Sequence, residues 1–236
     1  MNKDNFFIKE GYQTNPVMTF ESSPGDYWTD ARIETTRDFQ YYVYQRAQSI
    51  FKANGFKTIA DIGCGPAWKT KHFFSGVAQK VTLVDQPTLL EVVNRFFPEA
   101  EFNGLNLEED SWVASQKQDM IICSDVIEHL ANPTNLLKMI RENLNPEGIA
   151  IISTPERDYR RGKEIMHSPN KQHVREWNAA EMKAYLESEG FEVIRQEFDP
   201  QKIVSGSKYR LSRMLQSVYR RPTWSACQSA IVRLAK

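Results

Sequence analysis

Between Lys57 and Pro155 the chain alternates short apolar runs with longer stretches of helical periodicity, and this alternation restricts its fold more than any other feature. The runs are TIADIG, VTLVD, AEFNGLNL, DMIICSD and IAIISTP. Most of the gaps between them are long enough to hold a helix. Because strands that alternate with helices form a parallel sheet covered on both faces, the sequence predicts an α/β fold with a doubly wound sheet.

Two helices in this region have clear starts. Asn132 and Pro133 are typical of the first residues of a helix, and the apolar positions that follow them lie on one face. Asn178 and Glu181 have the spacing of a capping box, and Gly190 suits the end of that helix. Both patterns place helices between the predicted strands.

The two ends of the chain depart from this alternation. Residues 1–55 are rich in aromatic side chains, and the stretch from about Thr29 to Ala53 lacks Gly and Pro, so we expect an N-terminal helical cap or lid there. The main domain then comprises residues 56–236. Near its end, FEVIRQEF and SACQSAIVRL predict two antiparallel strands, which are separated by a basic helical insertion near residues 205–222.

Charge and cysteine content exclude several classes of protein. Thirty basic and thirty acidic residues balance, so no overall field attracts nucleic acid, and we expect no nucleic-acid partner. The three cysteines are scattered, which argues against a disulfide framework or a zinc site, and we expect no metal. Because the sequence shows neither a signal peptide nor an apolar run of roughly 18 residues, we expect no transmembrane segment and a cytoplasmic protein.

The segment IADIGCGPAWKT predicts a ligand site. In an open parallel sheet, ligands bind at the carboxyl ends of the strands where the strand order reverses, and the first strand usually supplies that edge. Gly63 and Gly65 remove side chains where the chain turns, so the backbone can contact a ligand. Asp85 ends the next strand, 20 residues after Gly65, where an acid accepts hydrogen bonds from ribose hydroxyls. These residues indicate a ligand that contains adenosine.

Three kinds of adenosine ligand fit this turn unequally. The segment lacks the G-x-x-x-x-G-K-[ST] loop that binds a nucleoside triphosphate. A dinucleotide, and with it an NAD(P)-dependent oxidoreductase, is an alternative, although Trp68 stands where the third glycine of that motif belongs. Asp61 would repel a pyrophosphate but suits a ligand that carries a sulfonium or an ammonium.

This turn, together with VTLVD and DMIICSDVIEHLANPTNLLKMIRENLNPEGIAIISTP, resembles the class I S-adenosylmethionine-dependent methyltransferases over roughly residues 55–200. The branch concerned has a fourth strand that ends in a DVIEHL-type sequence. The resemblance implies a Rossmann-like sheet of seven strands, mostly parallel with an antiparallel last strand, and S-adenosyl-L-methionine as the cofactor. In the family's arrangement, Asp61, Gly63 and Gly65 would surround the methionine part, Asp85 would hold the ribose, and Gln86 would lie against the adenine.

Further cofactor contacts follow from the same resemblance. Asn106 stands where the family often has an acid that binds the adenine amine, and its amide oxygen could accept that bond. Ser124 ends the fourth strand beneath the cofactor. The N-terminal cap would contribute Tyr27, Trp28 or Arg32.

The chemistry of methyl transfer suggests two catalytic histidines. Displacement at a sulfonium requires chiefly that acceptor, methyl and sulfur be aligned, and a base is needed only if the acceptor retains its proton. His129, in the turn after the fourth strand, is the first candidate base, although it could instead pack against the helix start, and His173 is the rival. Glu128 could assist either or simply favour a helix N-terminus.

The strip from Arg157 to Arg175 predicts the substrate site. It follows the fifth strand, and it is too polar for a core and too long for a bare connection. It resembles loops of bacterial methyltransferases associated with sugar, lipid-linked or secondary-metabolite substrates, in which an HVREW-like element recurs. Arg157, Arg175 and His173 could therefore engage hydroxyls, carboxylates or phosphates, and a solvated loop is the alternative.

The predicted function leaves the methyl acceptor open. The basic helix near Lys208 to Arg221 favours an anionic or membrane-proximal acceptor and a peripheral membrane contact, or else it packs on the sheet or on a second subunit of a homodimer. We predict a methyltransferase that acts on an oxygen or nitrogen of a small molecule, sugar or lipid-linked glycan. The alternatives are the oxidoreductase and a non-catalytic regulatory protein that binds S-adenosylmethionine.

Overall fold

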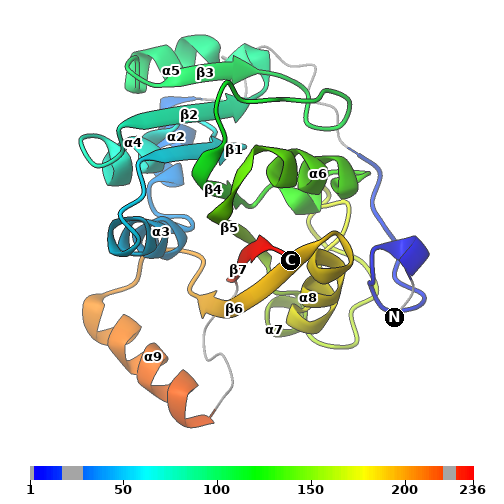
Figure 1. Ribbon diagram of the computed structural model, residues 1–236. Helices are drawn as coiled ribbons and strands as arrows, with labels where there is room; N and C mark the ends of the chain where they lie inside the picture. The colour runs from blue at the N-terminus through cyan, green and yellow to red at the C-terminus, as the bar shows by residue number, and fades with distance from the viewer. Residues whose placement is uncertain (1–2, 18–28, 220–226) are drawn as a thin grey trace.

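The computed structural model describes residues 3–17, 29–219 and 227–236, and seven strands form one sheet in it. The strands are β1 (Thr58–Ile62), β2 (Lys80–Asp85), β3 (Glu101–Gly104), β4 (Gln118–Ser124), β5 (Leu144–Pro155), β6 (Phe191–Asp199) and β7 (Cys227–Leu234). Their order is β3-β2-β1-β4-β5-β7-β6, and β7 is antiparallel to both neighbours (Figure 1). The other pairs are parallel, which confirms the predicted sheet.

Helices pack on both faces of this sheet (Figure 1). The helices of the described chain are α2 (Asp30–Thr36), α3 (Tyr41–Ala53), α4 (Trp68–Phe74), α5 (Leu90–Phe96), α6 (Pro133–Asn143), α7 (Arg157–Arg161), α8 (Ala179–Ser188) and α9 (Gly206–Tyr219), of which α9 stands apart from the sheet. Three short 3-10 turns accompany them in the described chain: η1 (Lys3–Asn5), η2 (Pro87–Leu89) and η3 (Ile127–His129). In the part of the chain that the structure describes, each helix is too short or too polar to cross a bilayer.

Two apolar cores lie on opposite faces of the sheet. On one face, Val43 and Phe51 of α3 pack with Ile59 of β1. On the other, Leu137 of α6 and Tyr185 of α8 belong to the larger core. Because α3 shares a core with the sheet, it is part of the folded body, and the division of the chain at residue 55 stays a prediction about domain organisation.

The two helix starts that the sequence predicts are confirmed, with the expected local causes. At α6, the Asn132 side chain accepts a hydrogen bond from the Thr134 N–H (3.2 Å). At α8, the Asn178 side chain accepts from the Glu181 N–H, and the Glu181 side chain accepts from the Asn178 N–H. These bonds satisfy backbone N–H groups that lack partners in the first turn of a helix.

The stretch from about Thr29 to Ala53 is helical, but it forms two helices, because α2 and α3 are separated by a break just before Tyr41. Gln40 has a left-handed backbone there (φ 52°). Its N–H donates to the carbonyl oxygen of Gln201 (2.9 Å), and its side chain donates to Asp125. These long-range hydrogen bonds stabilise the break more than continuing the helix would. The absence of Gly and Pro from this stretch does not reveal them.

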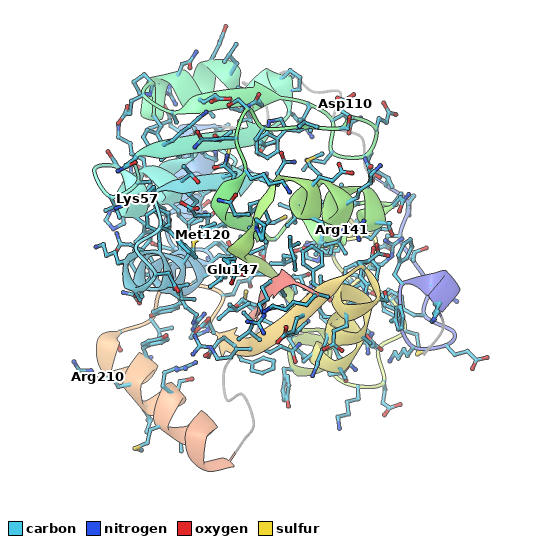
Figure 2. The ribbon with its side chains drawn as sticks, viewed as in Figure 1. Lys57, Asp110, Met120, Arg141, Glu147 and Arg210 are labelled. Atoms are coloured by element: carbon cyan, nitrogen blue, oxygen red, sulfur yellow. The ribbon has the colours of Figure 1, made fainter. Side chains whose placement is uncertain are left out.

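The helix between the last two strands, α9, lies within the predicted insertion and stands to one side of the sheet (Figure 1). Figure 2 shows Arg210 on this helix, well away from the strands. Tyr209 stacks on Tyr42 of α3 with ring centroids 4.0 Å apart, which joins α9 to the body. Leu211 is exposed. The predicted basic residues at positions 220 and 221 lie outside the described residues.

The carboxyl ends of β1, β2 and β4 meet where the strand order reverses. Ile62 of β1 is in register with Val84 of β2 on one side and with Cys123 of β4 on the other. In a doubly wound sheet, this reversal provides the crevice in which ligands bind. The turn after β1 and the segment after β4 therefore lie next to each other at the expected edge.

Candidate active site at the carboxyl edge of the sheet

The turn after β1 requires glycine for two reasons. Gly63 (φ 75°) and Gly65 (φ 54°) both have a left-handed backbone, which favours a residue without a Cβ. A Cβ at Gly63 would also overlap with Cγ2 of Val126, in the segment after β4. The two strand ends thus approach so closely that no side chain fits between them.

Asp85 joins this turn from the end of β2. Its Oδ2 accepts a hydrogen bond from the Gly65 N–H (2.8 Å), and its Oδ1 accepts from the Gln86 N–H (2.7 Å). Burial raises the pKa of this carboxyl, and the two N–H groups oppose the rise. Since a carboxylate has about four lone-pair sites, Asp85 keeps capacity for hydroxyl donors. The structure brings Gly63, Gly65 and Asp85 together, and their contact with a cofactor stays a prediction.

The remaining predicted cofactor residues lie along the same edge with different surroundings. Gln86 is exposed directly after β2. Asn106 follows β3, and its Oδ1 accepts a hydrogen bond from the Glu108 N–H (3.1 Å). Ser124 is buried at the end of β4, with its Oγ 2.7 Å from Oγ of Ser153. Asn106 and Ser124 therefore have partners inside the protein, whereas Gln86 faces solvent.

Asp61 lies beneath the glycine turn and is completely buried. The Tyr44 hydroxyl lies 3.1 Å from its Oδ1 and 3.0 Å from its Oδ2, and the Thr70 hydroxyl donates to Oδ2. Burial raises the pKa of Asp61 to about 6, although the Thr70 bond and the charge of Lys69 oppose the rise. Lys69 in turn donates to the carbonyl oxygen of Thr36 (3.1 Å). Asp61 thus places negative charge under the turn without exposing an oxygen.

Two carboxyl groups follow β4, next to the glycine turn. Asp125 has a left-handed backbone (φ 54°), which turns the chain towards η3. Its Oδ2 accepts from the Gln40 side chain, and its Oδ1 is buried without a partner among the described residues. Glu128 is completely buried, and its Oε2 accepts from the Thr154 hydroxyl (3.0 Å). Its Oε1 also has no partner in the described chain, and burial together with Asp125 raises the pKa of Glu128 well above its usual range.

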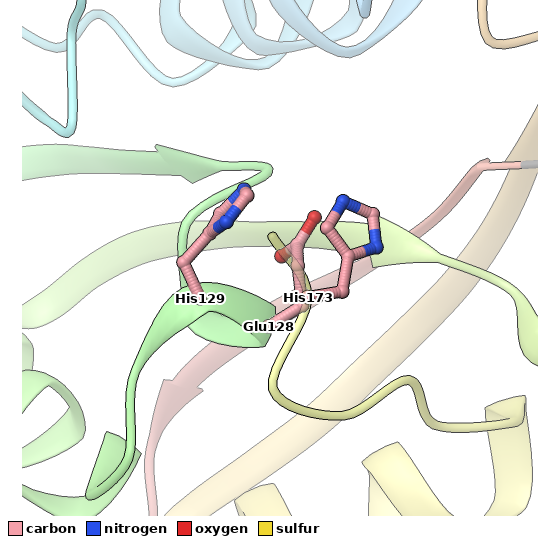
Figure 3. Close-up of side chains that lie close together, drawn as sticks. All are labelled: Glu128, His129 and His173. Carbon is pink, nitrogen blue, oxygen red and sulfur yellow. The ribbon is translucent and has the colours of Figure 1, made fainter. Parts of the chain in front are cut away.

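His129 and His173 complete this group, and we call Asp125, Glu128, His129 and His173 the β4 cluster. Figure 3 shows the Glu128 carboxylate between the two imidazole rings. The rings meet edge to face with centroids 4.9 Å apart. One ligand atom from each of Glu128, His129 and His173 lies within 4.8 Å of the others. The structure therefore brings the two predicted catalytic histidines together from η3 and from the loop between α7 and α8.

The hydrogen-bond partners of the two histidines indicate their tautomers. His129 Nδ1 is 2.7 Å from the carbonyl oxygen of Gln172, and a carbonyl only accepts, so Nδ1 carries the proton. His173 Nδ1 is 2.6 Å from Oε1 of Glu176, whose pKa is held at about 2 because hydrogen bonds from His173 and Arg161 outweigh its burial. Burial, with a contribution from His173, lowers the pKa of His129 to about 4. His129 is therefore neutral at pH 7, with a lone pair on Nε2.

Hydrogen bonds hold the loop that carries His173 against the turn after η3. The Arg175 guanidinium donates to the carbonyl oxygens of Leu130 (3.0 Å) and Ala131 (2.9 Å). Asn15 Nδ2 lies 3.0 to 3.1 Å from three carbonyl oxygens of the loop, those of Ser168, Asn170 and His173. The position of His173 therefore depends on Asn15 in the N-terminal segment and on the turn after η3.

The two arginines predicted to bind substrate have partners inside the protein. Arg157 is buried and forms two hydrogen bonds with the Glu181 carboxylate (2.6 and 2.9 Å) at the start of α8. The guanidinium of Arg175, besides its two carbonyl partners, lies 4.4 Å from the centre of the Phe6 ring. Contact with a substrate would require these interactions to be exchanged, and the substrate role of both arginines stays a prediction.

Sequence reasoning missed the residue that connects the N-terminal helices to the β4 cluster. Gln40 reaches Asp125 from 85 positions earlier in the chain, and no motif or periodicity marks it. Of the cap residues that the resemblance suggested, Arg32 lies on α2. Tyr27 and Trp28 lie outside the described residues.

Residues 36–196 match the family model described as a methyltransferase domain. The chain belongs to this methyltransferase family. The assignment confirms the resemblance to class I S-adenosylmethionine-dependent methyltransferases, and it decides against the oxidoreductase alternative.

Relatives of this methyltransferase carry matching names. A protein of Mycolicibacterium smegmatis named "Probable S-adenosylmethionine-dependent methyltransferase" is 30% identical over 140 residues, 58% of this chain and 52% of that protein. The ubiquinone biosynthesis O-methyltransferase of Actinobacillus pleuropneumoniae is 29% identical over 128 residues, 49% of this chain and 51% of that protein. This chain thus spans about half the length of these curated relatives.

A solved structure shows the same fold at low sequence identity. The N-methyltransferase NodS from Bradyrhizobium japonicum, in complex with S-adenosyl-L-homocysteine, has a TM-score of 0.57 and 12% identity. The match covers 84% of this chain and 90% of that one. At this identity the likeness shows the fold alone, because one fold supports many activities.

Proposed function

We propose that this methyltransferase transfers the methyl group of S-adenosyl-L-methionine to a hydroxyl oxygen of a small molecule. The relatives named for S-adenosylmethionine and for O-methylation support this reaction. An O–CH3 bond forms while the S–CH3 bond breaks, and the electron pair of the broken bond stays on sulfur. The hydroxyl loses its proton, and the products are a methyl ether and S-adenosylhomocysteine.

The cofactor binds across the ends of β1 and β2. Asp85 accepts hydrogen bonds from the ribose hydroxyls, Gln86 lies against the adenine, and the backbone at Gly63 and Gly65 contacts the methionine part. The geometry that supports this assignment is the close approach of the glycine turn to Asp85, at 2.8 Å. Asp61 favours the cationic groups of the ligand from below, because a buried charge is weakly screened.

The acceptor hydroxyl binds over the β4 cluster. The single observation that carries this assignment is a set of buried polar atoms without partners among the described residues, Oε1 of Glu128 and Oδ1 of Asp125. The lone pair on His129 Nε2 lies in the same cluster. A hydroxyl has one proton to donate and lone pairs that accept, so it can donate to one of these atoms and accept from the Glu128 carboxyl when that group is protonated; leaving the atoms unpaired would be costly.

His129 takes the proton of the acceptor hydroxyl. Burial lowers the pKa of His129 to about 4, so the ring is neutral and ready to accept at pH 7. A base this weak is sufficient, because the oxygen becomes strongly acidic as its bond to the methyl group forms. Proton removal therefore accompanies or follows the displacement.

The test is an assay of the purified protein with S-adenosyl-L-methionine and a panel of phenols, catechols, sugars and amines. We expect S-adenosylhomocysteine, together with a product that is heavier by one methyl group, from at least one hydroxyl acceptor. Methylation of amines alone would overturn the oxygen assignment. Cofactor binding without turnover on any acceptor would favour the non-catalytic alternative.

A further inference from the structure

We propose that Glu128, His129 and His173 bind a divalent cation of the Zn²⁺ or Mn²⁺ class, which holds the oxygen of the methyl acceptor. The binding site stands on its own geometry, whereas the purpose of the cation rests on the proposed methyl transfer. Two imidazoles and one carboxylate suit such ions, because Ca²⁺ prefers ligands that are all oxygen. The scattered cysteines argue against a cysteine-based site, but they do not bear on a site made of imidazole and carboxylate ligands.

The spacing of the three side chains is close to that of a metal site. Their ligand atoms lie within 4.8 Å of one another. Atoms that bind one ion at about 2.0–2.2 Å lie roughly 3–4 Å from one another. Side-chain rotations that move the ligand atoms by about 1 Å would therefore bring them to these distances. Figure 3 shows the carboxylate between the rings, the position from which it can share an ion with both.

Both histidines are oriented as metal ligands usually are. A histidine that binds a metal through one ring nitrogen nearly always donates its other N–H to a carboxylate or a backbone carbonyl. His129 donates from Nδ1 to the Gln172 carbonyl (2.7 Å), and His173 donates from Nδ1 to Glu176 (2.6 Å). Arg161 also binds Glu176, at 3.1 Å, which holds that carboxylate in position. Each ring therefore has Nε2 available for an ion.

The carboxyl groups of the cluster lack the partners that buried acids normally have. Glu128 Oε1 is buried and unpartnered among the described residues, and so is Asp125 Oδ1. Among the described residues, the Glu128 side chain accepts one hydrogen bond, which the Thr154 hydroxyl donates to its Oε2. A buried carboxylate is normally paired or bound to a metal, and an ion at this point would supply the missing partner.

An ion held by three protein ligands keeps positions open for the acceptor. The acceptor hydroxyl and a second oxygen on the adjacent carbon could fill these positions together, so an acceptor with two neighbouring oxygens, such as a catechol, would suit the site. The ion would lower the pKa of the bound hydroxyl. With the ion bound, His129 would be a ligand and not the base, so the proton of the hydroxyl would leave to water; without the ion, His129 would take it.

Metal binding can be tested without cofactor or acceptor. Chelator-treated protein is titrated with Zn²⁺ by calorimetry and with Co²⁺ by visible absorption, which reports nitrogen and oxygen ligands. We expect one ion per chain, and a loss of affinity of roughly 100-fold or more in Glu128→Gln and His173→Ala, since even outer partners of a metal site contribute about 10–100-fold. Glu176→Gln should lose about 10–100-fold.

The chain offers a matched control for these variants. His167 is exposed on the same loop as His173, so His167→Ala should bind the ion as the wild type does. Glu128→Gln retains an oxygen for the Thr154 hydroxyl, which makes it the variant least prone to misfold, and thermal melts check all of them. Absence of binding at one ion per chain, or an equal loss in His167→Ala, would overturn the site.

A second measurement separates the cation from the proposed function. Turnover of the chelated protein should fall and return on addition of Mn²⁺ or Zn²⁺, while its affinity for S-adenosylhomocysteine stays constant. Full turnover of chelated protein would overturn the catalytic part of this proposal and leave the methyl transfer standing. Stoichiometric metal binding by a protein that has no affinity for S-adenosylhomocysteine would overturn the proposed function instead.

Discussion

The two halves of the carboxyl edge differ in how their buried polar groups are satisfied. In the half formed by β1 and β2, Asp61 accepts hydrogen bonds from Tyr44 and Thr70, and Asp85 accepts from backbone N–H groups of the turn. In the half formed by the β4 cluster, Glu128 leaves one buried oxygen without a partner among the described residues. The first half is complete without a ligand, and the second is not.

This difference separates binding of the cofactor from activation of the acceptor. A cradle that is already formed needs little rearrangement to bind its ligand. The β4 cluster instead contains unsatisfied polar atoms, whose unfavourable free energy a ligand can remove. Substitutions in the two halves should therefore affect different measurements.

The largest expected effect comes from the β4 cluster. His129→Ala should lower kcat by about 10²–10⁴-fold, because it removes the side chain that acts on the acceptor hydroxyl, either as its base or as a ligand of the proposed ion. The Kd for S-adenosylhomocysteine, measured by calorimetry, should not change. His167→Ala is the control, and its kcat and its Kd for S-adenosylhomocysteine should equal those of the wild type. A similar loss of cofactor affinity in His129→Ala would show that the two halves are not separate.

The next effect is on the cofactor half. Asp85→Ala should weaken binding of S-adenosylhomocysteine by about 1–3 kcal/mol, the value of hydrogen bonds to a charged group. The kcat at saturating cofactor should change little. Glu187→Ala, an exposed acid on α8, is the control in calorimetry. Unchanged affinity in Asp85→Ala would remove the ribose assignment.

A third substitution tests the contact between the halves. Gly63→Ala should destabilise the fold by about 1–3 kcal/mol, because the new Cβ meets Val126 in addition to the strain of its left-handed backbone. Gly76 has a similar φ (69°), and a Cβ there meets no atom within 4 Å, so Gly76→Ala reports the strain alone. Thermal melts compare the two. Equal changes in Tm would mean that the strand ends can separate.

The smallest effect is on pH dependence. Burial raises the pKa of Asp61 to about 6, so this carboxyl is ionised at pH 7.5 and protonated at pH 5.5. Because the ionised form attracts the cationic amino group of S-adenosylhomocysteine, affinity should fall as pH drops through about 6, by roughly threefold. Calorimetry at several pH values measures this. The profile of Asp61→Asn should be flatter, and identical profiles would assign the dependence to another group.

Features set by local chemistry could be predicted from the sequence. The strands follow from apolar runs, and α6 and α8 follow from caps that involve residues two or three positions apart. The break at Gln40 could not be predicted in this way, since it depends on Gln201 and Asp125, which are distant in sequence. Local propensity is a weak guide where such contacts compete with it.

The site shows the same limit. His129 and His173 could be named as candidates, but the chain offers no local sign that their rings would meet at 4.9 Å with Glu128 between them. The charge of Arg157 and Arg175 favours a substrate role when only the sequence is considered. Both have their guanidinium groups bound by their own chain, as buried arginines require. Polarity alone does not distinguish a loop side chain that faces a ligand from one that holds the loop.

The loop between α7 and α8 is docked by the side chains of Asn15 and Arg175 rather than by a strand of the sheet. Its sequence between these anchors can therefore diversify while the scaffold is inherited unchanged. For enzyme engineering, residues 162–167 are the stretch to randomise when a library of new methylation specificities is wanted on this framework, because the Ser168 hydroxyl donates to Glu176 and should be kept.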